Sequence, residues 1–145
     1  MASLSDRLAS ARALTGHDPH LIATTIEARL GTRYTVHTLR LLKTRFPQAR
    51  FVWLMGADNL VQLPRWHGWL EIVRMMPFAV LPRPAYNQRA RAGLVALRLR
   101  RCRVADRDAG RLADRRAPAW SFPALPQHPG SATAIRRAQP FSEPE

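Results

Sequence analysis

The segment FVWLMGADNLVQLPRWHGWLEI, residues 51–72, places small, acidic and aromatic side chains directly after an apolar run. Gly56 permits a close approach of a ligand to the backbone, and Asp58 offers two acceptor oxygens to a ribose or an amine. Taken alone, Asp58 is better explained as the cap of a helix that starts at Asn59. The segment is therefore compatible both with half of a nucleotide site and with a simple strand-to-helix turn.

Two tryptophans follow within the same segment. Trp66 and Trp69 are three residues apart, so in a helix they would share one face, and by themselves they are more typical of a core. An indole beside a strand end can instead stack on a flat heterocycle. Arg65 and His67 keep this part of the chain polar enough to lie near the surface.

A second candidate site lies near the end of the chain, in SATAIRR. Ser131, Thr133 and Arg136 at a helix start would present hydroxyls, backbone N–H groups and a guanidinium to an anion, which suits a phosphate. A serine cap followed by an ordinary basic helix explains the same spacing, and spacing alone favours that simpler explanation.

The sequence shows no spacing typical of a metal site or of a catalytic nucleophile. The lone Cys102 provides neither an intrachain disulfide nor a cysteine pair for zinc. Of the five histidines only His17 and His20 have a spacing that can share a metal, and no carboxylate pattern supports them. We assign no metal site and no Ser/His/Asp arrangement.

The net charge of +13 is compatible with a nucleic-acid partner, because a basic face gathers phosphates. All the basic residues except Lys43 are arginine, a bias that GC-rich codons also produce. Charge alone therefore makes nucleic acid a weakly supported partner. The N-terminus has charges where a secretory signal would be apolar, and no run reaches membrane-spanning length, so we expect a cytoplasmic protein without membrane contact.

Apolar spacing predicts alternating helices and strands. Ser3 or Ser5 caps the first helix, Thr35 caps the second, and the apolar run 51–55 does not alternate, as in a strand buried on both faces. The expected helices are 4–14, 35–46, 66–75 and 88–101, with a helical turn at 59–63 and a loop or irregular helix at 103–119; the expected strands are 21–26, 51–55, 78–81 and 120–122.

This order predicts an α/β domain with a mostly parallel sheet, in which ligands bind beyond the carboxyl ends of the strands. Gly56 and Asp58 follow one strand, Arg83 follows the next, and residues 131–136 follow the last. We expect one domain over residues 1–137 and a flexible tail over 138–145.

Five motifs occur in the order GTRYTVHTL, FVWLMGADNL, LPRWHGWLEI, FAVLPRPAY and SATAIR. Between about Asp6 and Arg136 the chain resembles bacterial nicotinate-nucleotide adenylyltransferase. The resemblance implies a Rossmann-like nucleotidyltransferase fold. It also implies an enzyme of NAD biosynthesis that transfers the adenylyl group of ATP, assisted by Mg²⁺, to nicotinate mononucleotide, giving deamido-NAD and pyrophosphate.

The same resemblance implies roles for individual residues. Trp66 would stack on the nicotinate ring, and Thr35 would help to hold the carboxylate of that ring. Gly56 and Asp58 would line the nucleotide, with Arg83 near the nicotinate mononucleotide side. Ser131, Thr133 and Arg136 would meet the adenine edge and the phosphates of ATP.

Two departures from the family pattern stand out. The family opens with a strand and a His-x-Gly-His-type phosphate loop, neither of which this sequence contains, so no catalytic residue is assigned and we expect an N-terminally incomplete chain. Loss of that strand would leave neighbouring strands unpaired and favour self-association into a homo-oligomer. In SATAIR, Ala132 stands where the family usually has a second serine.

Three functional hypotheses remain open. The first is the adenylyltransferase. The second is an inactive remnant that binds nicotinate mononucleotide without turning over ATP. The third is an arginine-rich nucleic-acid-binding protein, which no helix-turn-helix, RNA-binding aromatic motif or zinc finger accompanies.

Overall fold

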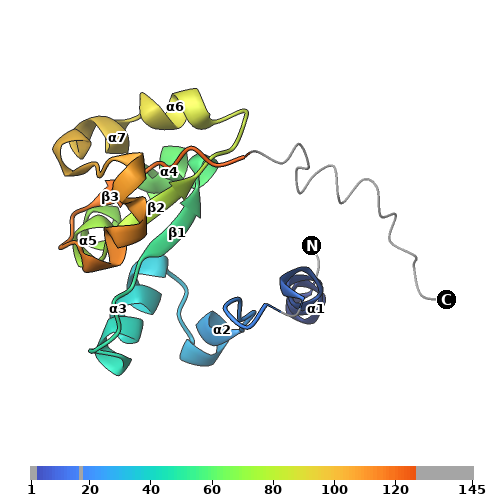
Figure 1. The fold of residues 1–145 in the computed structure, drawn as a ribbon. Coiled ribbons are helices and arrows are strands. Elements are labelled where there is room, and N and C mark those ends of the chain that lie inside the picture. Colours follow the sequence, from blue (N-terminus) through green and yellow to red (C-terminus); the bar gives the residue numbers. More distant parts are fainter. Residues whose placement is uncertain (1–2, 17, 127–145) are drawn as a thin grey trace. The chain divides into compact units, whose positions relative to one another are not determined.

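The chain divides into two units, Met1–Ala49 and Arg50–Glu145, and each is described by itself (Figure 1). The structure is a computed structural model and describes residues 3–16 and 18–126. The predicted SATAIRR helix and the tail over 138–145 lie outside the described residues.

The first unit opens with the helix α1, Leu4–Thr15, as the sequence predicts. Ser3 is the cap: its hydroxyl accepts a hydrogen bond from the Asp6 backbone N–H at 3.1 Å, and the Asp6 carboxylate accepts one from the Ser3 backbone N–H at 3.1 Å. Gly16 ends the helix at a positive φ of 54°. None of the residues of α1 is buried, so this helix contributes no side chain to a core.

The strand predicted at 21–26 is wrong. Residues 21–25 form no regular element, and Ile26 begins a short helix, α2, Ile26–Leu30. Leu21 and Ile22 are 55% and 82% exposed. β-branched residues favour a strand only where a neighbouring strand and a packed face are available, and within the described residues this segment pairs with no strand.

The predicted second helix is α3, Thr35–Arg45, which ends before Pro47 as expected. Its cap is Tyr34, and Thr35 is its first helical residue, so the prediction of Thr35 as the cap is wrong by one position. Val36 and Leu39 of α3 are buried, whereas Phe46, the last residue of the predicted helix, lies beyond the last turn and is 51% exposed.

The second unit contains a parallel sheet, which together with its helices confirms the α/β class. Its strands are β1, Trp53–Gly56, β2, Phe78–Leu81, and β3, Trp120–Ser121, in the order β1-β2-β3. The register pairs Trp53 with Phe78 and Gly56 with Leu81. Both strand pairs are parallel, so the carboxyl ends of all three lie at one edge of the sheet.

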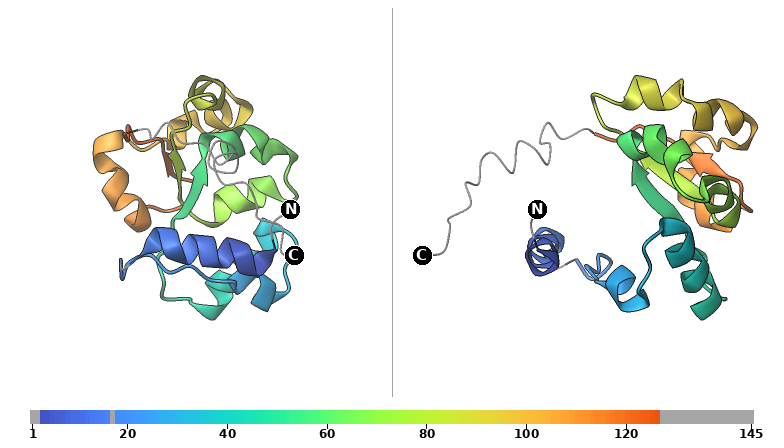
Figure 2. Two further views of the ribbon diagram at one scale, coloured as in Figure 1. Left: turned by 90° about the vertical axis from the view of Figure 1, so that its right-hand side faces the viewer. Right: turned by 180° about the vertical axis from the view of Figure 1, so that it is seen from behind.

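Helical segments connect these strands. Between β1 and β2 lie α4, Ala57–Gln62, η1, Leu63–Arg65, and α5, Trp69–Met75. Between β2 and β3 lie α6, Asn87–Arg91, α7, Leu94–Arg98, η2, Arg100–Cys102, and η3, Asp106–Asp114. Figure 2 shows α4 and α5 on one side of the strands and η3 on the other.

The strand β1 is buried on one face only. Met55 is 3% exposed, whereas Leu54, which points to the opposite face, is 61% exposed. The prediction of a strand buried on both faces is therefore wrong. The physical reason is that η3, on that side of the sheet, packs chiefly against β2 and β3.

Glycines interrupt two helices that apolar spacing predicts as continuous. The helix expected from Trp66 starts only at Trp69, because Gly68 adopts a φ of 67°. Trp66 and Trp69 therefore do not share a helix face. The helix expected over 88–101 is divided into α6 and α7 at Gly93, where a Cβ atom would lie 2.9 Å from the Arg89 carbonyl oxygen.

An aromatic pair forms the centre of the core of the second unit. Phe78 and Trp120 face each other from β2 and β3 with ring centroids 5.9 Å apart and an interplanar angle of 14°. The Trp120 indole N–H donates to the Leu99 carbonyl oxygen at 2.8 Å, so the buried indole is satisfied. This bond ties β3 to the end of α7.

Candidate functional site

Polar side chains from two strand ends meet at the carboxyl edge of the sheet. Asp58 lies two residues past Gly56, the last residue of β1, and Arg83 lies two residues past the end of β2. Arg83 Nε is 3.6 Å from Asp58 Oδ1. The structure thus brings together Gly56, Asp58 and Arg83, as the parallel sheet predicts.

The absence of a side chain at Gly56 is required for this arrangement. A Cβ atom there would lie 2.3 Å from Asp58 Oδ1 and 3.1 Å from Arg83 Nε. The backbone of Gly56, at φ −77° and ψ 159°, is one that any residue adopts. Space beside the ion pair, and not backbone conformation, therefore requires glycine at this position.

The Asp58 carboxylate is not the helix cap that the isolated motif favours. The helix α4 begins at Ala57 with Gly56 as its cap, and no side chain donates or accepts a capping bond. The side chain of Asp58 is 32% exposed as a whole, yet its Oδ1 atom is buried and has no hydrogen-bond partner. At 3.6 Å the guanidinium gives charge complementarity without a hydrogen bond, so this oxygen keeps its acceptor capacity.

The loop that carries Arg83 is held by its own hydrogen bonds. The Arg83 backbone N–H donates to Asn87 Oδ1 at 2.6 Å, and the Arg83 carbonyl oxygen accepts from the backbone N–H groups of Tyr86 and Asn87 at 2.8 and 3.1 Å. The side chain of Arg83 is 52% exposed. Asn87, which the sequence analysis did not single out, therefore orders the backbone from which the guanidinium extends.

Trp66 lies in the connection between η1 and α5 and contacts a second tryptophan. Its ring centroid is 5.8 Å from that of Trp53, at an interplanar angle of 53°. Trp53 begins β1, whereas Gly56 and Asp58 lie at the other end of that strand. No sequence spacing relates positions 53 and 66, so the sequence alone does not predict this contact.

The remaining candidate residues lie elsewhere. Thr35 is partly buried at the start of α3, in the first unit. Nearby, the hydroxyl of Thr32, which precedes α3, shares a hydrogen bond of 2.6 Å with the hydroxyl of Thr38 in that helix. Ser131, Thr133 and Arg136 lie outside the described residues.

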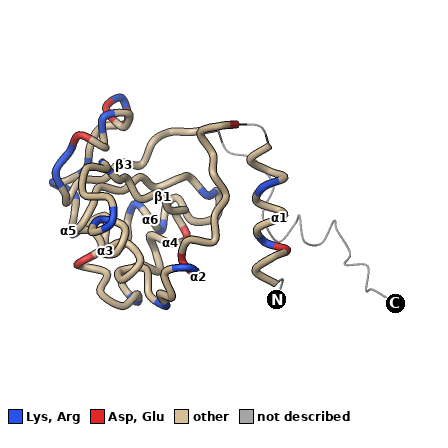
Figure 3. The backbone as a smooth tube through the Cα atoms, turned by 90° about the horizontal axis from the view of Figure 1, so that it is seen from below, with Lys and Arg blue, Asp and Glu red and all other residues tan. Residues whose placement is uncertain are grey.

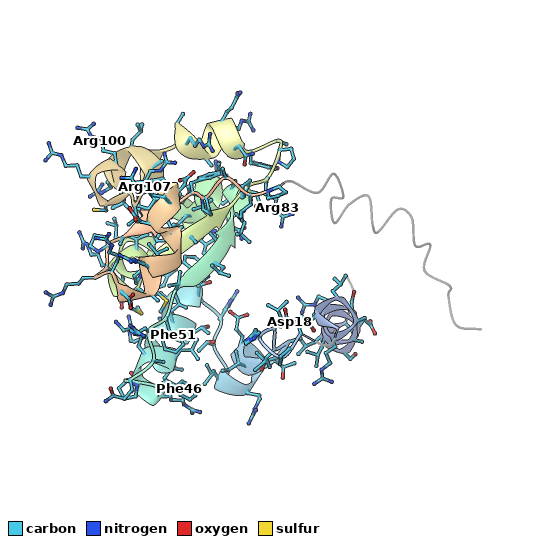
Figure 4. All side chains as sticks on the ribbon, in the orientation of Figure 1. Asp18, Phe46, Phe51, Arg83, Arg100 and Arg107 are labelled. Carbon is cyan, nitrogen blue, oxygen red and sulfur yellow. The ribbon has the colours of Figure 1, made fainter. Side chains whose placement is uncertain are left out.

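The charged groups of the described residues show no metal cluster. Within 3–16 and 18–126, no three side chains of His, Cys, Asp or Glu come together as metal ligands. Basic residues are distributed along several helices and loops (Figure 3). Arg83 points outward near the end of β2, well away from Arg100 and Arg107 (Figure 4).

An open hollow runs along the start of α5, lined by Gly68, Trp69, Leu70, Glu71 and Arg74; it includes neither Asp58 nor Arg83. In the part of the chain that the structure describes, the helices are too short or too polar to cross a membrane.

Known proteins resemble this chain over most of its length. The cytidylyltransferase-like family matches residues 1–138. The chain is 52% identical over 136 residues to a probable nicotinate-nucleotide adenylyltransferase of Parvibaculum lavamentivorans, covering 94% of this chain and 67% of that protein. A protein of the same description from Gluconacetobacter diazotrophicus is 54% identical, covering 94% and 63%, and one from Gluconobacter oxydans is 48% identical, covering 97% and 72%.

The chain thus spans roughly two thirds of the length of these relatives, 63% to 72%. The match includes the strand ends that carry Gly56, Asp58 and Arg83, together with the Trp66 segment. On this evidence the chain belongs to the cytidylyltransferase-like family and, within it, to the nicotinate-nucleotide adenylyltransferases.

Proposed function

We propose that the protein transfers the adenylyl group of ATP to nicotinate mononucleotide, giving deamido-NAD and pyrophosphate. The observation that carries this proposal is the pairing of Asp58 and Arg83 across two neighbouring strand ends, with glycine at position 56. The relatives described above have names that state the same activity. An anionic nucleotide with ribose hydroxyls is complementary to this combination of groups.

The two charged side chains have different proposed roles. The buried Oδ1 of Asp58 has no hydrogen-bond partner and accepts a hydrogen bond from a hydroxyl of the nucleotide. Arg83 is half exposed, and its guanidinium donates to an anionic group of nicotinate mononucleotide. The ion pair orients both groups before the nucleotide binds.

The proposed roles of the two ring-binding residues have different support. Trp66 is partly buried beside Trp53, and an indole in that position has a surface on which the flat nicotinate ring can stack. Thr35 belongs to the first unit, and its contact with the ring carboxylate rests on the family resemblance. The amino terminus of α3, which Thr35 begins, favours negative charge.

The reaction is an in-line displacement at phosphorus. A 5′-phosphate oxygen of nicotinate mononucleotide forms a bond to the α-phosphorus of ATP, the bond from that phosphorus to the α,β-bridging oxygen breaks, and pyrophosphate leaves. Such a transfer depends on positioning and on neutralising charge. We assign the ATP side to Ser131, Thr133 and Arg136, which supply hydroxyls and a guanidinium.

The described residues do not form a magnesium site of their own. Asp58 is the carboxylate with a buried, unpartnered oxygen, but its charged neighbour is the cation Arg83, and no ligand cluster surrounds it. Mg²⁺ commonly binds through substrate phosphates with one or two carboxylates. We therefore propose Mg²⁺ as part of the MgATP substrate, bound chiefly by the ATP phosphates.

An assay of adenylyl transfer tests the proposal. Purified chain with ATP, Mg²⁺ and nicotinate mononucleotide is expected to give deamido-NAD and pyrophosphate in equal amounts, with nicotinamide mononucleotide compared in parallel. Saturable binding of nicotinate mononucleotide without turnover would favour the inactive remnant. The absence of both binding and turnover would contradict the proposal.

A further inference from the structure

The contact between Trp53 and Trp66 joins a strand of the sheet to a connecting segment. Trp53 begins β1, where its backbone pairs with Phe78 and its N–H donates to the Pro77 carbonyl oxygen at 2.9 Å. Trp66 lies in the connection between η1 and α5. A ring on the sheet thus lies against a ring on a connecting segment, with 5.8 Å between their centroids.

The backbone of Trp66 is fixed by two bonds, but these do not orient its side chain. The Trp66 N–H donates to the Leu63 carbonyl oxygen at 2.9 Å, and the Trp66 carbonyl oxygen accepts from the Trp69 N–H at 3.2 Å. Trp66 is only partly buried, and its indole has an aromatic contact with the ring of Trp53. This contact can constrain the orientation of the indole.

Orientation matters for a stacking residue. Stacking requires the indole plane to lie parallel to the ligand ring, and a side chain that is ordered before binding loses less conformational freedom when the ligand arrives. The interplanar angle of 53° means that the rings of Trp53 and Trp66 are tilted and do not cover each other face to face. The Trp53 ring therefore contacts the Trp66 indole without covering a whole face of it.

We propose that Trp53 is a positioning residue that orients the indole of Trp66 for stacking on the nicotinate ring. This inference rests on the proposed function, because it takes nicotinate mononucleotide as the ligand of Trp66. Trp53 acts through Trp66 and does not itself touch the substrate. Replacing its ring therefore affects nicotinate mononucleotide affinity through the freedom of the Trp66 side chain.

The test compares a variant without a ring, Trp53→Leu, with one that keeps a ring, Trp53→Phe. Calorimetric titration of the full chain with nicotinate mononucleotide is expected to show affinity roughly threefold to tenfold weaker for Trp53→Leu and within about twofold of the original for Trp53→Phe. Trp69→Phe is the matched control, because Trp69 lies in α5 with its ring near Arg98. Trp53→Met replaces the leucine variant if that variant does not fold.

Circular dichroism provides a readout that does not depend on ligand. Two indoles at this distance and tilt are expected to give an exciton couplet, which Trp53→Leu and Trp66→Leu should each remove and Trp69→Phe should retain. Thermal unfolding of each variant is measured alongside. A couplet that persists in Trp53→Leu would show that the two rings do not interact in solution and would overturn the inference.

The binding results separate the two proposals. Equal affinity of the original chain and Trp53→Leu would overturn the positioning role and leave the proposed function standing. Loss of affinity in both Trp53→Leu and Trp53→Phe, together with a lower melting temperature, would show a structural role and would also overturn it. If the original chain does not bind nicotinate mononucleotide, the proposed function itself fails, whatever the variants show.

Discussion

Asp58 Oδ1 lies 3.6 Å from Arg83 Nε, across the carboxyl ends of two adjacent parallel strands. The carboxylate oxygen is buried without a hydrogen bond, while the guanidinium is half exposed. The pair lies at the sheet edge where ligands bind in α/β folds, which is the reason for the proposed binding roles of both side chains.

Gly56→Ala is expected to weaken nicotinate mononucleotide binding about tenfold, because the new methyl group displaces the Asp58 carboxylate. The backbone at this position accepts alanine, so the free energy of unfolding should change by less than about 1 kcal/mol. Calorimetric titration and thermal unfolding check both statements. The matched control is Gly110→Ala, where nothing lies within 4 Å of the added Cβ atom. Equal affinity of the two variants would contradict the prediction.

Arg83→Ala is expected to reduce nicotinate mononucleotide affinity at least about tenfold, since it removes a charge-assisted hydrogen bond worth about 1.5 to 3 kcal/mol. Stability should change little, because the side chain is 52% exposed and the bond from its backbone to Asn87 remains. Arg100→Ala removes the same charge far from the strand ends (Figure 4). Equal losses in both variants would show that long-range charge, not a local contact, binds the nucleotide.

Arg136→Ala is expected to raise the KM for ATP about tenfold or more while leaving the affinity for nicotinate mononucleotide unchanged. The proposed reason is the loss of a guanidinium that meets the ATP phosphates. Steady-state kinetics with each substrate varied in turn measures the effect. Arg137→Ala is the control, because it removes the neighbouring charge. A rise in KM for nicotinate mononucleotide alone would reverse the assignment of the two sites.

The cap of α1 is expected to weaken in acid. The hydrogen bonds from the Ser3 hydroxyl and then the Ser3 backbone hold the pKa of Asp6 below its ordinary value of 3.8. A lowered pKa in the folded state means that the stabilisation is present above pH 3.8 and is lost as the pH falls through the lower folded value. NMR titration of the Asp6 carboxyl carbon and of the α1 amides tests this. Asp6→Asn should abolish the pH dependence of the α1 amide signals. An Asp6 pKa at or above 3.8 would contradict the prediction.

Local signals in the sequence were sufficient to predict the capped helix α1, the strands β1 and β2, and the polar residues that follow these strands. The sequence placed Gly56, Asp58 and Arg83 at one edge because parallel strands with helical crossovers leave no other arrangement. Asp58 was harder to interpret, because a cap and a ligand-binding carboxylate occupy the same place after a strand.

Features that depend on contacts distant in sequence could not be predicted. The segment 21–26 has strand composition, but composition does not supply the partner strand that a ladder needs. Exposure of Leu54 depends on which helices reach β1. The neighbourhood of Trp66 differs from the predicted helix face, because the positive φ of Gly68 delays α5 and a residue thirteen positions earlier, Trp53, provides the contact.

The central claim is that this chain binds nicotinate mononucleotide through the Trp66 ring and the strand ends of β1 and β2. The most direct test is calorimetric titration of the chain and of Trp66→Ala with that nucleotide, with Trp69→Phe as the control. We predict saturable binding to the original chain and to the control, and affinity about tenfold or more weaker in Trp66→Ala, because stacking on an aromatic side chain is worth about 1 to 3 kcal/mol. Binding that is undetectable in the original chain, or unchanged in Trp66→Ala, would contradict the claim.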